Sequence, residues 1–167
     1  MKRRDLIKGA GAGLLAGAFT SARAAHLPAV GWRMASSFPK SLDTIYGASE
    51  VLARRLEQIT QGKFQIRVFA GGEIVPGLQV LDAVQNGTVE CGHSASYYYV
   101  GKNMAFAFDT TLPFGLTARM QNSWMYSGGG LKLTREFFKD YNILNFPGGN
   151  TGVQMGGWFR KEIKTLA

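Results

Sequence analysis

The alternation of strand and helix patterns between Val30 and Ser94 constrains the fold of this chain more than any other feature. The pattern has five segments: a strand at Val30–Ser36, a helix capped by Ser41 or Asp43 and running to about Thr60, a strand at Phe64–Phe69, a helix at about Gly77–Asn86 and a strand at Val89–Ser94. Apolar residues recur at helical spacing in both helices, and Gly62 and Gly87 are predicted to end them. Such an alternation implies right-handed crossovers and a parallel sheet covered by helices on both faces. We therefore predict an α/β fold.

The second half of the chain continues with helices and glycine-rich turns. Two further helices are predicted at about Ala118–Tyr126 and Leu131–Asp140, followed by a strand at Ile143–Phe146 and a further candidate strand at Val153–Phe159. In open parallel sheets, ligands bind beyond the C-terminal ends of the strands. Four loops answer that description: Ser37–Leu42, Ala70–Pro76, Ala95–Lys102 and Phe146–Phe159.

The last of these loops is unusually rich in glycine. Phe146–Phe159 contains five glycines, and its hydrogen-bonding side chains are Asn150, Thr151, Gln154 and Trp158. Glycine permits unusual backbone dihedrals and close approach of another group. Because the segment carries two carboxamides but no acid, base or nucleophile, it suits a hinge or a ligand cradle better than a catalytic centre. An ordinary glycine-rich loop is the alternative.

Residues 1–24 have the composition of a signal peptide. Basic residues near the start precede the apolar run Gly9–Phe19, which is too short to cross a bilayer, and Ala22–Ala24 fits a cleavage site. The pair Arg3-Arg4 resembles a twin-arginine signal. We expect export to the periplasm with cleavage near Ala24.

Charge and cysteine content exclude several classes of function. The net charge is +8, but the leader holds five of the 19 basic and one of the 11 acidic residues, which leaves 14 basic against 10 acidic residues and a net charge of +4. Because no basic run remains, nucleic acid is not an expected partner. The chain has one cysteine and no cluster of His and Cys at metal-ligand spacing. A small exported enzyme that uses Cys91 and His93 is an alternative, although no group that would orient the imidazole stands beside them.

Three adjacent tyrosines follow the third predicted strand. Tyr97, Tyr98 and Tyr99 offer apolar rings and hydroxyls that can donate to a carboxylate. Neighbouring side chains cannot all face the same way, so we expect at most two of them to reach a ligand. The other reading is that one or two simply pack in the core.

Several stretches together resemble one family. They are Ala35–Thr44, Gly72–Gln79, Asn86–His93, Tyr97–Lys102 and Phe146–Arg160. In these stretches the chain is similar to the N-terminal half of a TRAP transporter solute-binding protein, in the branch that binds 2-oxo acids such as pyruvate and related monocarboxylates. The resemblance implies a type II periplasmic binding protein fold, in which two lobes close on a solute, and delivery of that solute to a sodium-coupled membrane permease. It implies no enzymatic activity.

The resemblance also implies site residues. Tyr98, Tyr99, Asn150 and Gln154 match ligand contacts of the family, and Gln154 matches an amide that gives an oxygen to a sodium ion beside the solute. An amide oxygen is a hard donor suited to such an ion. No organic cofactor is implied.

On this resemblance the chain divides into three parts. Residues 1–24 are the signal peptide, residues 25–148 are lobe I, and residues 149–167 are the hinge and the start of a truncated lobe II. Family members are about twice as long, and the arginine that pairs with the solute carboxylate would lie beyond residue 167. The chain therefore resembles an N-terminal fragment, expected to bind weakly by itself and to dimerise only with the absent C-terminal helices. The ligand lobe of a sensor is the remaining alternative.

Overall fold

A three-stranded parallel sheet forms the centre of the first part of the molecule. The computed structural model describes residues 29–110, 112–152, 154 and 156–165, so the predicted signal peptide lies outside the described residues. The strands are β1 (Val30–Ser36), β2 (Phe64–Phe69) and β3 (Cys91–His93). Their order in the sheet is β2-β1-β3, so the first strand of the sequence is the central one. The predicted α/β architecture with a parallel sheet is confirmed.

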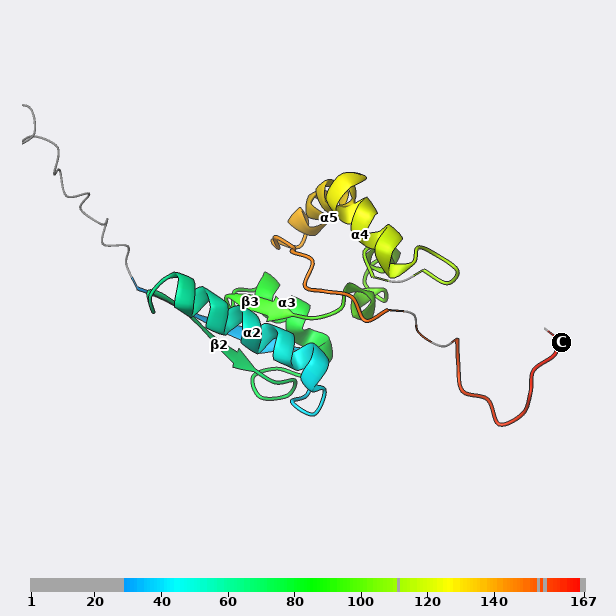
Figure 1. Cartoon of the computed structure of the whole chain (residues 1–167), viewed down its shortest axis with the longest axis horizontal. Helices are drawn as coiled ribbons and strands as arrows, with labels where there is room; N and C mark the ends of the chain where they lie inside the picture. Colours follow the sequence, from blue (N-terminus) through cyan, green and yellow to red (C-terminus); the bar gives the residue numbers. More distant parts are fainter. Residues whose placement is uncertain (1–28, 111, 153, 155, 166–167) are drawn as a thin grey trace, which may run out of the picture.

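The two crossover helices cover opposite faces of this sheet. Helix α2 (Asp43–Ile59) connects β1 to β2, and the short helix η1 (Gly77–Gln79) followed by α3 (Val80–Gln85) connects β2 to β3. Val68, which pairs with Met34, packs against the cluster that contains Tyr46 of α2. Ala35, one residue further along β1, packs against Val80 of α3. Since successive strand residues point to opposite faces, α2 and α3 lie on opposite sides (Figure 1).

The predicted helix boundaries hold within a few residues, but the predicted N-cap of α2 is wrong. Leu42 occupies the N-cap position with no side-chain hydrogen bond, so neither Ser41 nor Asp43 caps the helix. Asp43 instead lies in the first turn, where its charge favours the helix dipole. Gly62 and Gly87 end the two helices as predicted, with φ angles of 79° and 71°. The third strand is shorter than predicted because Val89 packs into the core cluster of α3 before the ladder begins.

The helices after β3 form a second cluster. The elements are η2 (Ser96–Tyr99), η3 (Met104–Ala107), α4 (Ala118–Ser127) and α5 (Gly130–Lys139). Phe106 is 1% exposed and lies at the centre of an aromatic cluster with Tyr99, Phe137, Phe138 and Tyr141. Leu81 of α3 belongs to the same cluster, which therefore joins the helical part to the sheet layer (Figure 1).

The predicted strand at Ile143–Phe146 is wrong. These residues form no ladder with any described strand, and the backbone N–H of Ile143 bonds to Phe138 O in the turn after α5. Asn145 is held by side chains of α5, through Arg135 Nε and Thr134 Oγ1. Ile143 and Asn145 are partly buried, whereas Leu144 and Phe146 are exposed, so the apolar run follows the helices without joining the sheet. The described residues of the candidate strand Val153–Phe159 are likewise not in a strand.

No helix within the described residues is both long and apolar enough to cross a bilayer.

Candidate functional site

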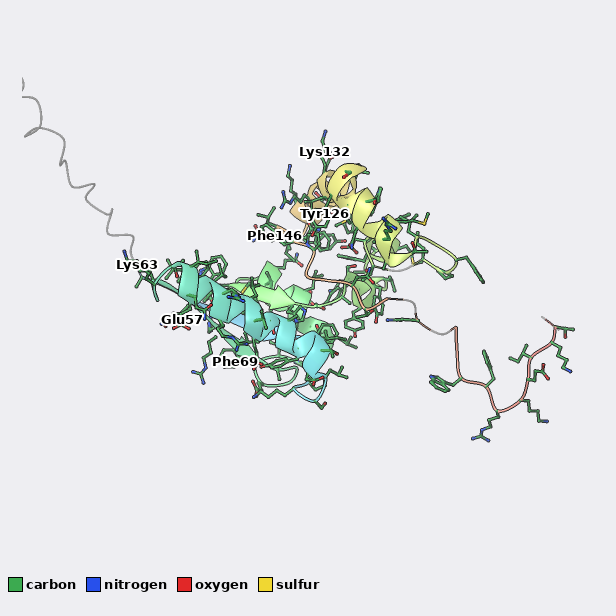
Figure 2. All side chains as sticks on the ribbon, in the orientation of Figure 1. Glu57, Lys63, Phe69, Tyr126, Lys132 and Phe146 are labelled. Atoms are coloured by element: carbon green, nitrogen blue, oxygen red, sulfur yellow. The ribbon has the colours of Figure 1, made fainter. Side chains whose placement is uncertain are left out.

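The carboxyl ends of the three strands meet at one edge of the sheet, as the sequence predicts. Because the strands are parallel, Ser36, Phe69 and His93 end them on the same side. Figure 2 shows the direction of β2: Lys63, just before the strand, and Phe69, its last residue, lie at opposite ends. We call the edge at Ser36, Phe69 and His93 the carboxyl edge.

Hydrogen bonds join the three loops that leave the carboxyl edge. The N–H of Ser37 donates to His93 O at 2.8 Å, and the N–H of Gly71 donates to Phe38 O at 3.0 Å. Lys40 and Glu73 form an ion pair of 2.7 Å across the loops after β1 and β2. The loops after β1, β2 and β3 are therefore tied to one another rather than independent.

Ser37 lies at the centre of this arrangement. Its carbonyl oxygen would be 2.9 Å from a Cβ at Gly71 and 2.7 Å from a Cβ at Gly77. Both distances are shorter than real Cβ contacts, so only glycine fits at these two positions without a shift of the backbone. The Ser37 hydroxyl lies 2.6 Å from Gly77 O and 2.7 Å from the Ser94 hydroxyl.

The tyrosine triplet lies at the carboxyl edge in η2, and its members differ in role. Tyr99 is 3% exposed, packs with Phe106, and its hydroxyl bonds to Ser94 Oγ at 2.8 Å and to the N–H of Leu81 at 3.2 Å. Tyr98 is partly exposed and lies between the rings of Phe38 and Tyr97. Burial, with a further contribution from a hydrogen bond with Tyr97, raises the pKa of Tyr98 to about 12, so its hydroxyl stays protonated.

The two predicted carboxamides lie outside the carboxyl edge. Asn150 and Gln154 are exposed, and Asn150 Oδ1 accepts a hydrogen bond from Gly152 N at 2.7 Å within its own turn. The C-terminal segment, red in Figure 1, extends away from the sheet and helices. The structure therefore brings Tyr98 and Tyr99 together at the edge but does not bring Asn150 and Gln154 to them, and their assignment as ligand contacts stays a prediction.

Cys91 and His93 share one face of β3 but show no sign of activation. Burial raises the pKa of the Cys91 thiol to about 11, and the Sγ atom lies 3.7 Å from Arg33 O. Burial lowers the pKa of His93, whose ring packs on Phe38 and whose Nδ1 lies 3.4 Å from Ser36 Oγ. A catalytic cysteine needs a lowered thiol pKa, so this environment disfavours the alternative of a thiol enzyme.

Two shallow hollows lie away from the tyrosines. One of about 320 Å³ lies between α2 and β2, lined by Glu57 and Arg67 among others, and one of about 180 Å³ is lined by residues of η1 and α3 and their flanking loops. Neither contains a predicted site residue. We place the candidate site at the carboxyl edge because the loops and the phenolic donors converge there.

Sequence reasoning missed Ser37 and Ser94, which are the main polar links at the edge. Each serine is the first residue after its strand in the structure, but only the register Ser36↔His93, which the sequence pattern does not reveal, places them side by side.

A parallel sheet with helices on both faces and with linked loops at its carboxyl edge is the architecture of a lobe of a periplasmic solute-binding protein. The family model for bacterial extracellular solute-binding proteins of family 7 (DctP) matches residues 35–167, and the chain belongs to this family.

The curated and solved relatives of this chain are also periplasmic solute-binding proteins. A monocarboxylate 2-oxoacid-binding periplasmic protein of Nostoc sp. is 52% identical over 174 residues, covering 100% of this chain and 48% of the relative. A TRAP transporter solute-binding protein of Bordetella bronchiseptica is 60% identical with a TM-score of 0.79, covering 83% of this chain and 41% of that one; it is described as a dimer with copurified calcium and picolinate in one active site and the other site apo.

A third relative, the TRAP periplasmic solute-binding protein of Pseudoalteromonas atlantica, is described with bound sodium and pyruvate. It is 44% identical with a TM-score of 0.78, covering 82% of this chain and 42% of that one. The chain spans about half the length of the curated relative that it matches.

Proposed function

We propose that this chain forms the first lobe of an exported receptor that captures a small monocarboxylate, a 2-oxo acid such as pyruvate, for a TRAP transporter. The observation that carries the proposal is the carboxyl edge, where linked loops converge and the partly exposed Tyr98 lies beside Phe38. A phenol can donate to a carboxylate oxygen, and the neighbouring rings supply apolar contacts for the rest of a small acid.

The relatives support both the class of solute and an accompanying cation. Pyruvate or picolinate occurs together with sodium or calcium in the two solved relatives described above. Among the predicted ligand contacts, the side-chain amide of Gln154 provides a hard oxygen for such an ion. Within the described residues, no group of three His, Cys, Asp or Glu could hold a metal. A neutral amide oxygen suits sodium or calcium as one ligand among several.

The domain roles follow from the same proposal. Residues 25–148 act as lobe I, and the glycine-rich stretch that begins at 149 acts as the hinge that carries Asn150 and Gln154 over the edge when the receptor closes. The segment of residues 1–24 directs the chain to the periplasm, where the partner is the membrane permease of the transporter. In this role the chain binds and delivers a solute and catalyses no reaction.

A hybrid protein tests the proposal. Residues 29–160 of this chain replace the aligned part of the Bordetella bronchiseptica relative, and pyruvate binding is measured by calorimetry in sodium chloride and in choline chloride. We expect saturable binding that weakens without sodium. Gln154→Ala should weaken binding and reduce its sodium dependence, whereas Gln58→Ala, an exposed glutamine on α2, serves as the matched control.

One result with the hybrid protein would contradict the proposed function. If the hybrid folds but binds pyruvate no better than it binds acetate or chloride, while the unmodified relative binds its solute, lobe I of this chain does not serve a 2-oxo acid receptor.

A further inference from the structure

Four consecutive hydrogen bonds run across the carboxyl edge through three hydroxyl groups. The distances are 3.2 Å from Leu81 N to the Tyr99 hydroxyl, 2.8 Å from there to Ser94 Oγ, 2.7 Å on to Ser37 Oγ and 2.6 Å on to Gly77 O. We call Ser37, Ser94 and Tyr99 the hydroxyl series. The proposed function gives no role to Ser37 or Ser94.

The carbonyl oxygen of Gly77 fixes the donor at one end of the hydroxyl series. A carbonyl oxygen only accepts, so the single hydroxyl proton of Ser37 goes to Gly77 O. The Ser94 hydroxyl lies within hydrogen-bond distance of both Ser37 and Tyr99, and between Ser94 and Tyr99 either hydroxyl can donate. The N–H of Leu81 donates to Tyr99, so the donor at the other end of the series is fixed as well.

The hydroxyl series joins five segments at the edge. Ser37 follows β1, Ser94 follows β3, and Tyr99 ends η2; Gly77 begins η1, and Leu81 lies in the first turn of α3. The N–H groups of a first helical turn have no partner within the helix, so Tyr99 satisfies a donor that would otherwise be buried and unpaired. Leu81 and Tyr99 are both buried in the aromatic cluster, where an unsatisfied group is costly.

Burial and hydrogen bonding separate the roles of two adjacent tyrosines. Tyr99 is 3% exposed, and its hydroxyl bonds to Ser94 Oγ and to the N–H of Leu81, so it is not open to a solute. Tyr98, the preceding residue of η2, is partly exposed and lies beside Phe38. We infer that the hydroxyl series is a positioning device: it fixes η2 against the loop after β1, so that Tyr98 and not Tyr99 meets the solute.

The first test needs no solute and is independent of the proposed function. In the 15N-labelled 167-residue chain, amide exchange at Leu81 is compared between the parent and Ser37→Ala, Ser94→Ala and Tyr99→Phe. We expect exchange at least about fivefold faster in all three, because each change removes a link. Ser37 does not touch Leu81, so an effect there must travel through the series. Ser49→Ala, which removes a buried hydroxyl in α2, is the matched control.

Two outcomes of this test overturn the inference. The first is unchanged Leu81 exchange in both serine variants; the second is the same acceleration in Ser49→Ala. If Tyr99→Phe does not fold, Ser94→Thr against Ser94→Ala decides, because threonine retains the hydroxyl and should restore the parent exchange rate.

The second test rests on the proposed function and uses the hybrid receptor. Ser94→Ala and Tyr99→Phe should each weaken pyruvate binding by roughly tenfold, and the double variant should weaken it by much less than the product, since either change breaks the same series. If Tyr99 touched the solute directly, the serine variants would bind normally and the inference would fail. A parent hybrid that does not bind pyruvate contradicts the proposed function, while Leu81 exchange still decides the role of the series.

Discussion

At the scale of single residues, the environment of an ionisable group decides what it can do. Arg33, on the exposed part of β1, and Glu90, the residue before β3, illustrate this. The Arg33 guanidinium and the Arg33 N–H both donate to the Glu90 carboxylate, which lowers the pKa of Glu90 to about 2. The carboxylate is therefore stabilised in its charged form by the fold itself.

The lowered pKa of Glu90 makes the folded protein less stable as the pH falls. A depressed carboxyl pKa contributes stability above the unfolded value of about 4.3, and that stability is lost as the pH falls toward 2. Glu90→Gln should therefore flatten the fall in melting temperature between about pH 4.3 and pH 2. Glu50→Gln, on the exposed face of α2, provides the control. If the melting temperature of Glu90→Gln fell with pH as steeply as that of the parent, the stabilising role of the Glu90 carboxylate would be contradicted.

Cys91 provides a second residue-scale prediction. A rise in the thiol pKa from 9.0 to about 11 lowers the thiolate fraction at pH 8 by roughly a hundredfold. Modification of the folded chain by a thiol reagent should be slower than that of the urea-unfolded chain by at least this order. Rapid modification of Cys91 in the folded protein would contradict this prediction and favour the alternative of a reactive cysteine.

At the scale of elements, α3 packs on the sheet through a glycine. A Cβ at Gly92 would lie 2.6 Å from Val80 Cγ1 and 2.9 Å from Val84 Cγ2. The close contact sets the distance between helix and strand, and it explains why β3 carries no side chain at this position.

Two glycine substitutions should have opposite effects on stability. Gly92→Ala forces α3 away from β3 and should lower the free energy of unfolding by about 1–3 kcal/mol. Gly47→Ala in α2 meets no atom within 4 Å and should raise it by roughly 0.5–1 kcal/mol, because glycine disfavours helix. Urea unfolding measures both. Equal effects would show that the packing distance at α3 is not set by Gly92.

The elements also show which features the sequence predicts. Periodic apolar residues and terminal glycines predicted β1, β2, α2, α4 and α5 because those signals are local. The short apolar stretch Ile143–Phe146 has the composition of a strand, but the pattern does not reveal whether another strand lies beside it. Ser37 and Ser94 become a pair only through strand register, which composition does not encode. A stretch with five glycines has little local preference, so the place of Asn150 and Gln154 depends on what packs around it.

At the scale of the whole molecule, many large apolar side chains are exposed. They include Leu52 of α2, Phe114 and Leu116 in the loop before α4, Met120 of α4, and Trp158 in the C-terminal segment. Exposed apolar side chains in such number favour association with another body or with other copies of the chain.

The 167-residue chain should therefore associate more readily than the hybrid receptor. We expect concentration-dependent light scattering and strong binding of a hydrophobic dye by the chain, and much weaker signals from the hybrid at equal concentration. Phe114→Ser should reduce the dye signal of the chain, while Thr44→Ser, an exposed polar change in α2, should not. A monodisperse, dye-negative chain would contradict this expectation.

The position of β1 at the centre of the sheet determines how late the native topology can form during synthesis. Both neighbours of β1 are translated after it, and its pairing with β3 joins residues 57 apart, such as Ser36 and His93. Contacts of such long sequence separation form slowly, because a large loop must close first. A nascent chain that has not yet reached His93 carries β1 with one bare hydrogen-bonding edge, which makes the early intermediate a natural client for chaperones.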